Sequence, residues 1–210
     1  MLTFAVPKGR MLHETIDRLN KIGIELPDFD PDSRELIVYD REKNYKFVIV
    51  KPFDVTTYVE YGAADVGVAG KDVIEEHDAD IYEPLDLGFS ECRLVVARPE
   101  NQEANPDYPR VATEFMNISE KYFAEKGENV ELIKMHGSVE LTPLIDLAHR
   151  IVDIASTGRT LRQNGLVEEE TILESSARLI VNRPAMKLHH DEVQTLINDF
   201  NSVISDAQPL

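Results

Sequence analysis

Short apolar runs alternate with apolar stripes at helical spacing along nearly the whole chain. Residues 2–6 form one such run, and Leu12, Ile16 and Leu19 then follow on one helix face. Because neighbouring parallel strands need a crossover, usually a helix, this alternation predicts an α/β fold with mostly parallel sheets. The predicted strands are residues 36–39, 45–50, 64–69, 81–87, 91–97, 110–113, 130–134, 151–154 and 177–182, and later helices are predicted at 54–61, 72–76, 115–126, 140–148 and 193–204.

A polar loop at residues 98–109, with three prolines, is the clearest break in composition. A chain of 210 residues is long enough for one large or two small domains. We therefore predict two small α/β lobes with a boundary near residue 90. Ligands of such folds collect at the carboxyl ends of strands and between lobes, which predicts a binding cleft there.

Acidic residues dominate the charge, which is −17 at pH 7. This excess argues against a nucleic-acid surface, because that affinity comes from Lys and Arg on phosphates. It leaves room for a local basic pocket that binds an anionic small molecule. The acidic run at residues 168–170 is interpreted as a solvated face.

The N-terminal sequence does not have the charge order of a signal peptide, and no window reaches the ~18 apolar residues of a membrane-spanning helix. These features predict a cytoplasmic protein. Cys92 is the single cysteine, so no internal disulfide is expected. The histidines include no i,i+4 pair, and we predict no metal site held by the protein alone.

The strongest local signal for function is the segment 151–161, IVDIASTGRTL. An acid, Asp153, lies at the end of a predicted strand, and a small turn then leads into a helix start. Unpaired N–H groups and the dipole of a helix N-terminus favour an anion, and Gly158 lets the backbone approach it closely. The segment predicts a cradle for a ribose 5-phosphate; the alternative is an ordinary turn capped by Ser or Thr. Hydroxyl donors in it are Ser156, Thr157 and Thr160.

A second signal is the cationic turn Lys8-Gly9-Arg10 after the first predicted strand. Arg presents a planar fork to phosphate oxygens, and Lys presents a compact charge. In a chain this acidic, we favour polyphosphate binding over the alternative of a solvated basic turn. The small residues of a third segment, 54–72, are by themselves better explained by packing.

Taken in order, these segments resemble the ATP phosphoribosyltransferase family over nearly the whole chain. The resemblance rests on residues 7–10, 54–72, 92–97, 137–141, 151–161 and 177–182. The length is similar to the short form of the family, which lacks a C-terminal regulatory domain. The resemblance therefore implies a homodimer within a hetero-octamer, with a regulatory subunit similar to histidyl-tRNA synthetase.

The activity implied by this resemblance is the first step of histidine biosynthesis. Adenine N1 of ATP attacks the ribose C1 of 5-phosphoribosyl 1-pyrophosphate (PRPP), pyrophosphate leaves, and N1-(5-phosphoribosyl)-ATP forms. N1 is already a neutral lone pair, so catalysis should rest on positioning and on electrostatic stabilisation of the leaving group. Mg²⁺ bound with the substrate phosphates is the implied cofactor.

The resemblance also implies roles for individual residues. The turn at 155–160 would hold the 5-phosphate, Asp153 the ribose hydroxyls, and Glu140 the sugar or a Mg²⁺-bound water. The implied PRPP-binding set is Asp153, Ala155, Ser156, Thr157, Gly158, Arg159, Thr160 and Glu140, and the implied set for ATP or polyphosphate is Lys8, Gly9, Arg10 and Asp54.

Arg10 and Arg34 are the catalytic candidates by the same resemblance. Arg34 would reach an active site, either its own or that of a neighbouring subunit; the alternative is a surface charge, which is the usual role of a lone Arg in such a loop. Asp54 has an equally good alternative as a helix N-cap.

Two other function classes stay open. Two-lobed chains of this kind also resemble periplasmic-type binding modules, which would hold a small anion without turnover. In that layout residues 92–97 and 177–182 are paired crossing strands, the first lobe comprises 1–90 and 183–210, and the second comprises 91–182. Type I phosphoribosyltransferases carry a similar loop, but usually with two adjacent acids where this chain has Asp153-Ile154.

Overall fold

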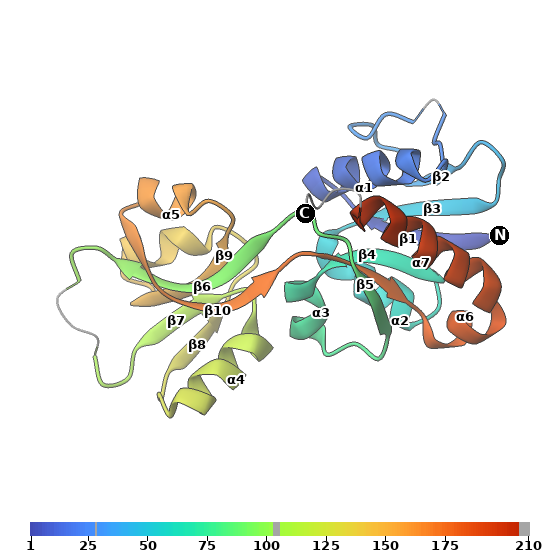
Figure 1. The fold of residues 1–210 in the computed structure, drawn as a ribbon. Helices are drawn as coiled ribbons and strands as arrows, with labels where there is room; N and C mark the ends of the chain where they lie inside the picture. The colour runs from blue at the N-terminus through green and yellow to red at the C-terminus, as the bar shows by residue number, and fades with distance from the viewer. Residues whose placement is uncertain (28, 103–105, 206–210) are drawn as a thin grey trace. The chain divides into compact units, whose positions relative to one another are not determined.

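The structure is a computed structural model that describes residues 1–27, 29–102 and 106–205, in two compact units (Figure 1). The first unit contains Met1–Ser90 and Ser176–Leu210, and the second contains Glu91–Ser175. Each unit consists of one β-sheet with helices packed on it. The predicted two-lobed α/β class is confirmed. Among the described residues, no helix is long and apolar enough to cross a membrane.

The first unit has a six-stranded sheet in the order β2-β3-β1-β4-β11-β5. In this sheet β1 runs parallel to both β3 and β4, so the carboxyl ends of these three strands lie at the same edge. The strands are β1 (Leu2–Pro7), β2 (Ile37–Tyr39), β3 (Tyr45–Val50), β4 (Val66–Gly70), β5 (Tyr82–Asp86) and β11 (Ala177–Val181).

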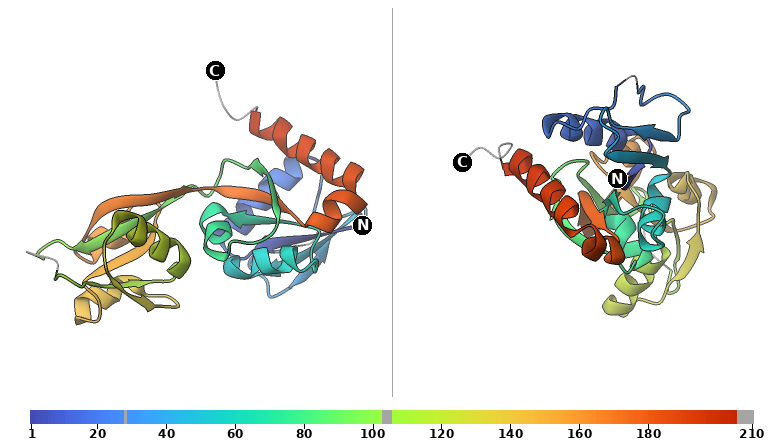
Figure 2. Two further views of the ribbon diagram at one scale, coloured as in Figure 1. Left: turned by 90° about the horizontal axis from the view of Figure 1, so that it is seen from below. Right: turned by 90° about the vertical axis from the view of Figure 1, so that its right-hand side faces the viewer.

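Helices cover both faces of this sheet, with α1 and α7 on one face and α2 and α3 on the other (Figure 2). Phe4 packs in the α1 and α7 core, whereas its neighbour Ala5 packs in the α2 and α3 core. A strand buried on both faces is apolar at successive positions, which explains the continuous apolar run Phe4-Ala5-Val6. The helical elements are α1 (Arg10–Lys21), η1 (Pro52–Asp54), α2 (Val55–Glu60), α3 (Lys71–His77), α6 (Arg183–Leu188) and α7 (His190–Ser205).

The second unit has a five-stranded sheet in the order β10-β6-β9-β7-β8 and a separate core around Val95, Ile151 and Leu161. Its strands are β6 (Cys92–Pro99), β7 (Arg110–Thr113), β8 (Glu131–Lys134), β9 (Arg150–Ala155) and β10 (Leu166–Ser175). Its helical elements are α4 (Met116–Lys126), η2 (Val139–Ile145) and α5 (Arg159–Gln163).

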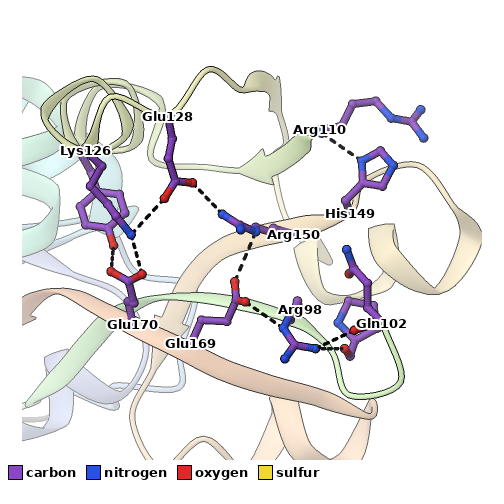
Figure 3. A network of polar contacts seen from close by, with 11 residues as sticks. Arg98, Gln102, Arg110, Lys126, Glu128, His149, Arg150, Glu169 and Glu170 are labelled. Carbon is purple, nitrogen blue, oxygen red and sulfur yellow. Dashed lines mark hydrogen bonds and ion pairs between the residues drawn. The ribbon is translucent and has the colours of Figure 1, made fainter. Parts of the chain in front are cut away.

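A chain of ion pairs holds the start of β9 in place (Figure 3). Arg150 Nη1 lies 2.9 Å from Glu128 Oε2, and Arg150 Nε lies 3.3 Å from Glu169 Oε2. Glu169 also pairs with Arg98, at 2.8 Å, and Glu128 with Lys126, at 3.1 Å. The network joins α4, β6, β9 and β10, so the strand that leads into the 153–160 segment is fixed at its beginning.

Two sequence predictions about the sheets are wrong, and one strand was not predicted. The sheets are mixed, because four of the nine described strand pairs are parallel and five are antiparallel. Residues 92–97 do not pair with 177–182: β6 pairs with β9 and β10, and β11 pairs with β4 and β5. The strand without a sequence prediction is β10, the edge strand that pairs with β6.

Two predicted boundaries also change. Residues 176–182 belong to the first unit rather than the second, because β11 pairs with strands of the first sheet. The helix predicted at 140–148 is the 3₁₀ element η2, which has Pro143 inside it. Proline has no N–H to donate, so a regular α-helix is not sustained there.

Candidate functional site

The predicted phosphate cradle forms a tight turn between β9 and α5. Ala155 ends the strand, Ser156 and Thr157 are exposed, and Gly158 precedes α5 with φ of +66°. No side-chain hydrogen bond caps this helix. The alternative of a turn capped by Ser or Thr is therefore wrong. The Ser156 and Thr157 hydroxyls and the first N–H groups of α5 are not used by a cap.

Asp153 is a half-buried carboxylate three residues before the exposed part of this turn. Burial raises its pKa to about 6, the Ile154 N–H opposes this shift, and the negative charges of Glu140 and Glu114 add to it. The Ile154 N–H donates to Asp153 Oδ1 at 2.8 Å. A perturbed acid beside an exposed polar turn marks a candidate binding site. Glu140 lies in the first turn of η2 and is half-buried.

The turn is also contacted by side chains from outside it. Arg162 Nη2 donates to the Thr157 carbonyl oxygen at 2.7 Å. A Cβ atom at Gly158 would lie 2.3 Å from Glu168 Oε1 and 2.9 Å from Arg162 Nη1, so a larger residue would displace the ends of these two side chains, and φ of +66° also favours glycine. Arg93 Nη1 pairs with Glu168 Oε2 at 2.9 Å.

Arg162, Glu168 and Glu114 are neighbours of this site that were not predicted from the sequence. The i,i+4 spacing of Gly158 and Arg162 was a usable signal, since residues four apart share a helix face. Glu114 and Glu168 are brought in by sheet pairing, which no local pattern reveals. Arg159 and Thr160 lie at the start of α5 and are exposed, as a binding role for them requires.

The second predicted group lies in the first unit, at the sheet edge where β1, β3 and β4 end. Lys8 and Arg10 are exposed, and Gly9 between them has φ of +87°. The Lys8 N–H donates to the Val50 carbonyl at 2.8 Å, which ties the turn to the end of β3. Arg10 Nε lies 4.0 Å from Glu14 Oε1, and 60% of the Arg10 side chain is exposed. The cations thus face solvent at a strand-end edge, where ligands of α/β folds bind.

Asp54 and Arg34 lie in the first unit as well. Asp54 follows β3 at the same edge, is exposed, and occupies the position before α2 without a capping side-chain hydrogen bond. Asp54 therefore occupies the N-cap position that the alternative predicts, and its side chain makes no capping hydrogen bond there. Arg34 is exposed in the loop between α1 and β2. The structure thus brings Lys8, Gly9, Arg10 and Asp54 to one edge and groups residues 153–160 with Glu140 in the other unit.

Comparison with known sequences identifies the protein family that this chain matches. The family model of ATP phosphoribosyltransferase (HisG) matches residues 51–202. An ATP phosphoribosyltransferase of Syntrophotalea carbinolica is 50% identical over 210 residues, covering 98% of this chain and 96% of the relative. An ATP phosphoribosyltransferase of Bacillus licheniformis is 50% identical over 203 residues, covering 97% of this chain and 95% of the relative.

Solved structures agree with the sequence comparison. The ATP phosphoribosyl transferase (HisG:HisZ) complex from Thermotoga maritima contains a chain that matches with a TM-score of 0.86 and 31% identity, covering 98% of this chain and all of that one. The structure of holo ArgBP from the same organism matches with a TM-score of 0.59 and 13% identity, covering 98% of this chain and 89% of that one. The second likeness concerns the fold alone.

The fold defines a two-lobed α/β protein of the periplasmic-binding-protein-like kind, and each unit presents an exposed polar or cationic turn after a strand. The two relatives, which are 50% identical to this chain along nearly their full lengths, are transferases. The chain belongs to the ATP phosphoribosyltransferase family, the enzymes of the first step of histidine biosynthesis.

Proposed function

We propose that this chain transfers the 5-phosphoribosyl group of PRPP to N1 of ATP. The bond between C1 of the ribose and the pyrophosphate oxygen breaks, and its electron pair leaves with pyrophosphate. The lone pair of adenine N1 forms the new C1–N1 bond, so no proton has to be removed from the nucleophile. The observation that carries this proposal is the half-buried Asp153 followed by the exposed Ser156 and Thr157, in a turn without a side-chain cap.

In this proposal the second unit binds PRPP. The 155–160 turn holds the 5-phosphate through backbone N–H groups and the hydroxyls of Ser156, Thr157 and Thr160, and Arg159 adds a positive charge. Asp153 accepts hydrogen bonds from the ribose hydroxyls, with Glu140 beside it. A carboxylate with a pKa of about 6 is ionised at pH 7 and can accept from both hydroxyls.

The first unit binds the polyphosphate groups. Lys8 and Arg10 face solvent at the strand-end edge, and the open Gly9 turn lets phosphate oxygens approach the backbone. Arg10 stabilises the charge that develops as pyrophosphate leaves, and Arg34 acts with it from its exposed loop. Asp54 contacts the adenosine part of ATP.

Mg²⁺ fits this arrangement as a companion of the substrates. The described residues contain no group of three or more His, Cys, Asp or Glu suited to holding a metal ion. Mg²⁺ needs only one or two carboxylates when substrate phosphates and waters complete its shell. Glu140 is the residue placed to contact it through water, and the ion would supply positive charge to the leaving pyrophosphate.

A regulatory partner is the remaining part of the proposal. The Thermotoga maritima relative forms a HisG:HisZ complex. This chain spans the full length of that relative's chain, so we propose that it also assembles as a homodimer within a hetero-octamer with a regulatory subunit similar to histidyl-tRNA synthetase. With ATP as a substrate, its proposed location is the cytoplasm.

Incubation of the purified protein with ATP, PRPP and Mg²⁺ tests the function, with and without the regulatory subunit of the same organism. Mass spectrometry should detect N1-(5-phosphoribosyl)-ATP and an equal amount of pyrophosphate. The matched variants are Arg10→Met, which should lose most of the rate, and the exposed Lys21→Met on the same helix, which should not. If no product forms under either condition while PRPP still binds, the binding-module alternative holds instead.

A further inference from the structure

The guanidinium of Arg162 contacts the turn at residues 155–160, which is the proposed site of the 5-phosphate. Arg162 is the fourth residue of α5, and its backbone N–H donates to the Gly158 carbonyl at 3.1 Å. Its side chain turns back, so that Nη2 donates to the Thr157 carbonyl at 2.7 Å. Its other terminal nitrogen, Nη1, lies 2.9 Å from the point that a Cβ of Gly158 would occupy. One side chain thus contacts two successive residues of the turn.

The contact with Thr157 sets the direction of the next N–H group. The described residues contain no cis peptide bond, and the C=O and N–H of a trans peptide point in opposite directions. Arg162 holds the Thr157 carbonyl on its own side of the turn. The Gly158 N–H, which belongs to the same peptide plane, must therefore point away from the guanidinium.

Glu168 of β10 closes the turn from another direction. Its Oε1 occupies the space beside the Gly158 Cα, at 2.3 Å from a Cβ position that only glycine leaves empty. Its Oε2 is paired with Arg93 of β6 at 2.9 Å. The ion pair offsets the negative charge that Glu168 would otherwise place beside an anion site. The peptide between Thr157 and Gly158 is thus held at its carbonyl by Arg162 and confined at its Cα by Glu168.

We propose that Arg162 is a positioning residue for PRPP, which rests on the proposed function. By holding the Thr157 carbonyl, Arg162 turns the Gly158 N–H toward the 5-phosphate before PRPP binds. The cost of ordering this peptide is then met on folding rather than on binding, and a preorganised donor contributes more affinity than a mobile one.

Variants of Arg162 test this role in the complete protein. Arg162→Met removes the donor and keeps much of the side-chain length, Arg162→Lys restores one donor, and Gln163→Ala, on the next residue, is the control. Calorimetry measures the affinity for ribose 5-phosphate, and steady-state rates give KM for PRPP and for ATP. We expect Arg162→Met to weaken ribose 5-phosphate and PRPP by about tenfold, which is the scale of one hydrogen bond, and to leave KM for ATP unchanged. Arg162→Lys should recover part of the loss, and Gln163→Ala should match the wild type.

Three results would overturn the positioning role. The first is an unchanged ribose 5-phosphate affinity in Arg162→Met. The second is an equal loss for PRPP and ATP together with a lowered melting temperature, which indicates a structural residue. The third is a weaker salt dependence of ribose 5-phosphate affinity, which indicates a direct ionic contact with the phosphate. If Arg162→Met does not fold, Arg162→Leu, which also removes the donor, gives the same comparison. Turnover by the wild type is scored separately, so failure of the proposed function is distinguishable from failure of this role.

Discussion

Asp153 is kept in the protein at a cost in stability. Burial and the nearby charges of Glu140 and Glu114 disfavour its ionised form, against the pull of the Ile154 N–H. A residue that folding alone would not select is typical of a binding site, where function opposes stability.

Asp153→Asn should therefore stabilise the protein at pH 7. The pKa rises from 3.8 to about 6 on folding, so between these values the folded state retains a proton that the unfolded state has lost. The stability of the wild type then falls as pH rises through this window, by up to about 2–3 kcal/mol, and stays reduced above it. Urea unfolding at several pH values should show that Asp153→Asn removes this fall, while its affinity for PRPP is weakened.

The exposed Asp107→Asn serves as the control for this measurement and should leave the pH dependence unchanged. Parallel stability curves for the wild type and Asp153→Asn between pH 4 and 6 would contradict the assignment. Stabilisation without any loss of PRPP affinity would remove Asp153 from the site.

The residues of the turn itself were predictable because the signal for them is local. An acid at a strand end, small hydroxyl residues and a glycine at a helix start are contiguous in the sequence, and the structure places them in that order. Glu114 and Glu168 were not predictable, because their nearness to the turn depends on how β7 and β10 are placed in the sheet.

At the scale of elements, β10 shows why periodicity in the sequence does not reveal every strand. Its segment contains three successive glutamates, which mask the alternation of a strand, and its register with β6 shifts at two places. Each shift changes which side chains share a face. The interpretation of residues 168–170 as a solvated face holds for Glu169 and Glu170, which are exposed, whereas Glu168 is half-buried. The three glutamates form ion pairs with Arg93, Arg98 and Lys126, in the order Glu168, Glu169, Glu170.

One buried side chain joins two elements that are distant in sequence. Asn182 Nδ2 donates to the Val59 carbonyl at 2.7 Å, near the end of α2, and Asn182 Oδ1 accepts from the Ala185 N–H at 3.1 Å, at the start of α6. Only 5% of Asn182 is exposed. Its amide therefore forms hydrogen bonds with the carboxyl end of α2 and with the amino end of α6.

Asn182→Ala should destabilise the protein by about 2–3 kcal/mol, because it removes a helix cap and leaves a buried carbonyl without its donor. Urea unfolding measures this loss, with the exposed Asn198→Ala on α7 as the control, for which a change below about 0.5 kcal/mol is expected. A similar small change for both variants would show that water replaces the Asn182 contacts.

At the scale of the whole molecule, the two units differ in how the chain builds them. The second unit is one continuous segment whose ends are paired, since Cys92 and Ser175 are register partners of β6 and β10. The first unit is assembled from two segments. The composition break predicted the first crossing point near residue 90, but no polar loop marks the return, because β11 follows β10 after a single residue.

The segment 91–175 should therefore fold when it is produced alone. It has its own core and closely spaced ends, which are the properties of an independent domain. Circular dichroism should show mixed helix and strand content with a cooperative urea transition, and calorimetry should detect binding of ribose 5-phosphate. A segment that stays unfolded would mean that the second unit depends on the first for its stability.

The interrupted first unit also constrains how the protein is made. During synthesis β4, whose five residues are all buried in the finished sheet, is complete before its neighbour β11 exists. About a hundred further residues must be added, which takes roughly 5–20 s at ribosomal speed. The entire second unit can fold in this interval, while β4 stays an unpaired apolar edge. The growing chain is thus most prone to aggregation after β4 has been synthesised and before β11 has been, rather than when the first residues leave the ribosome.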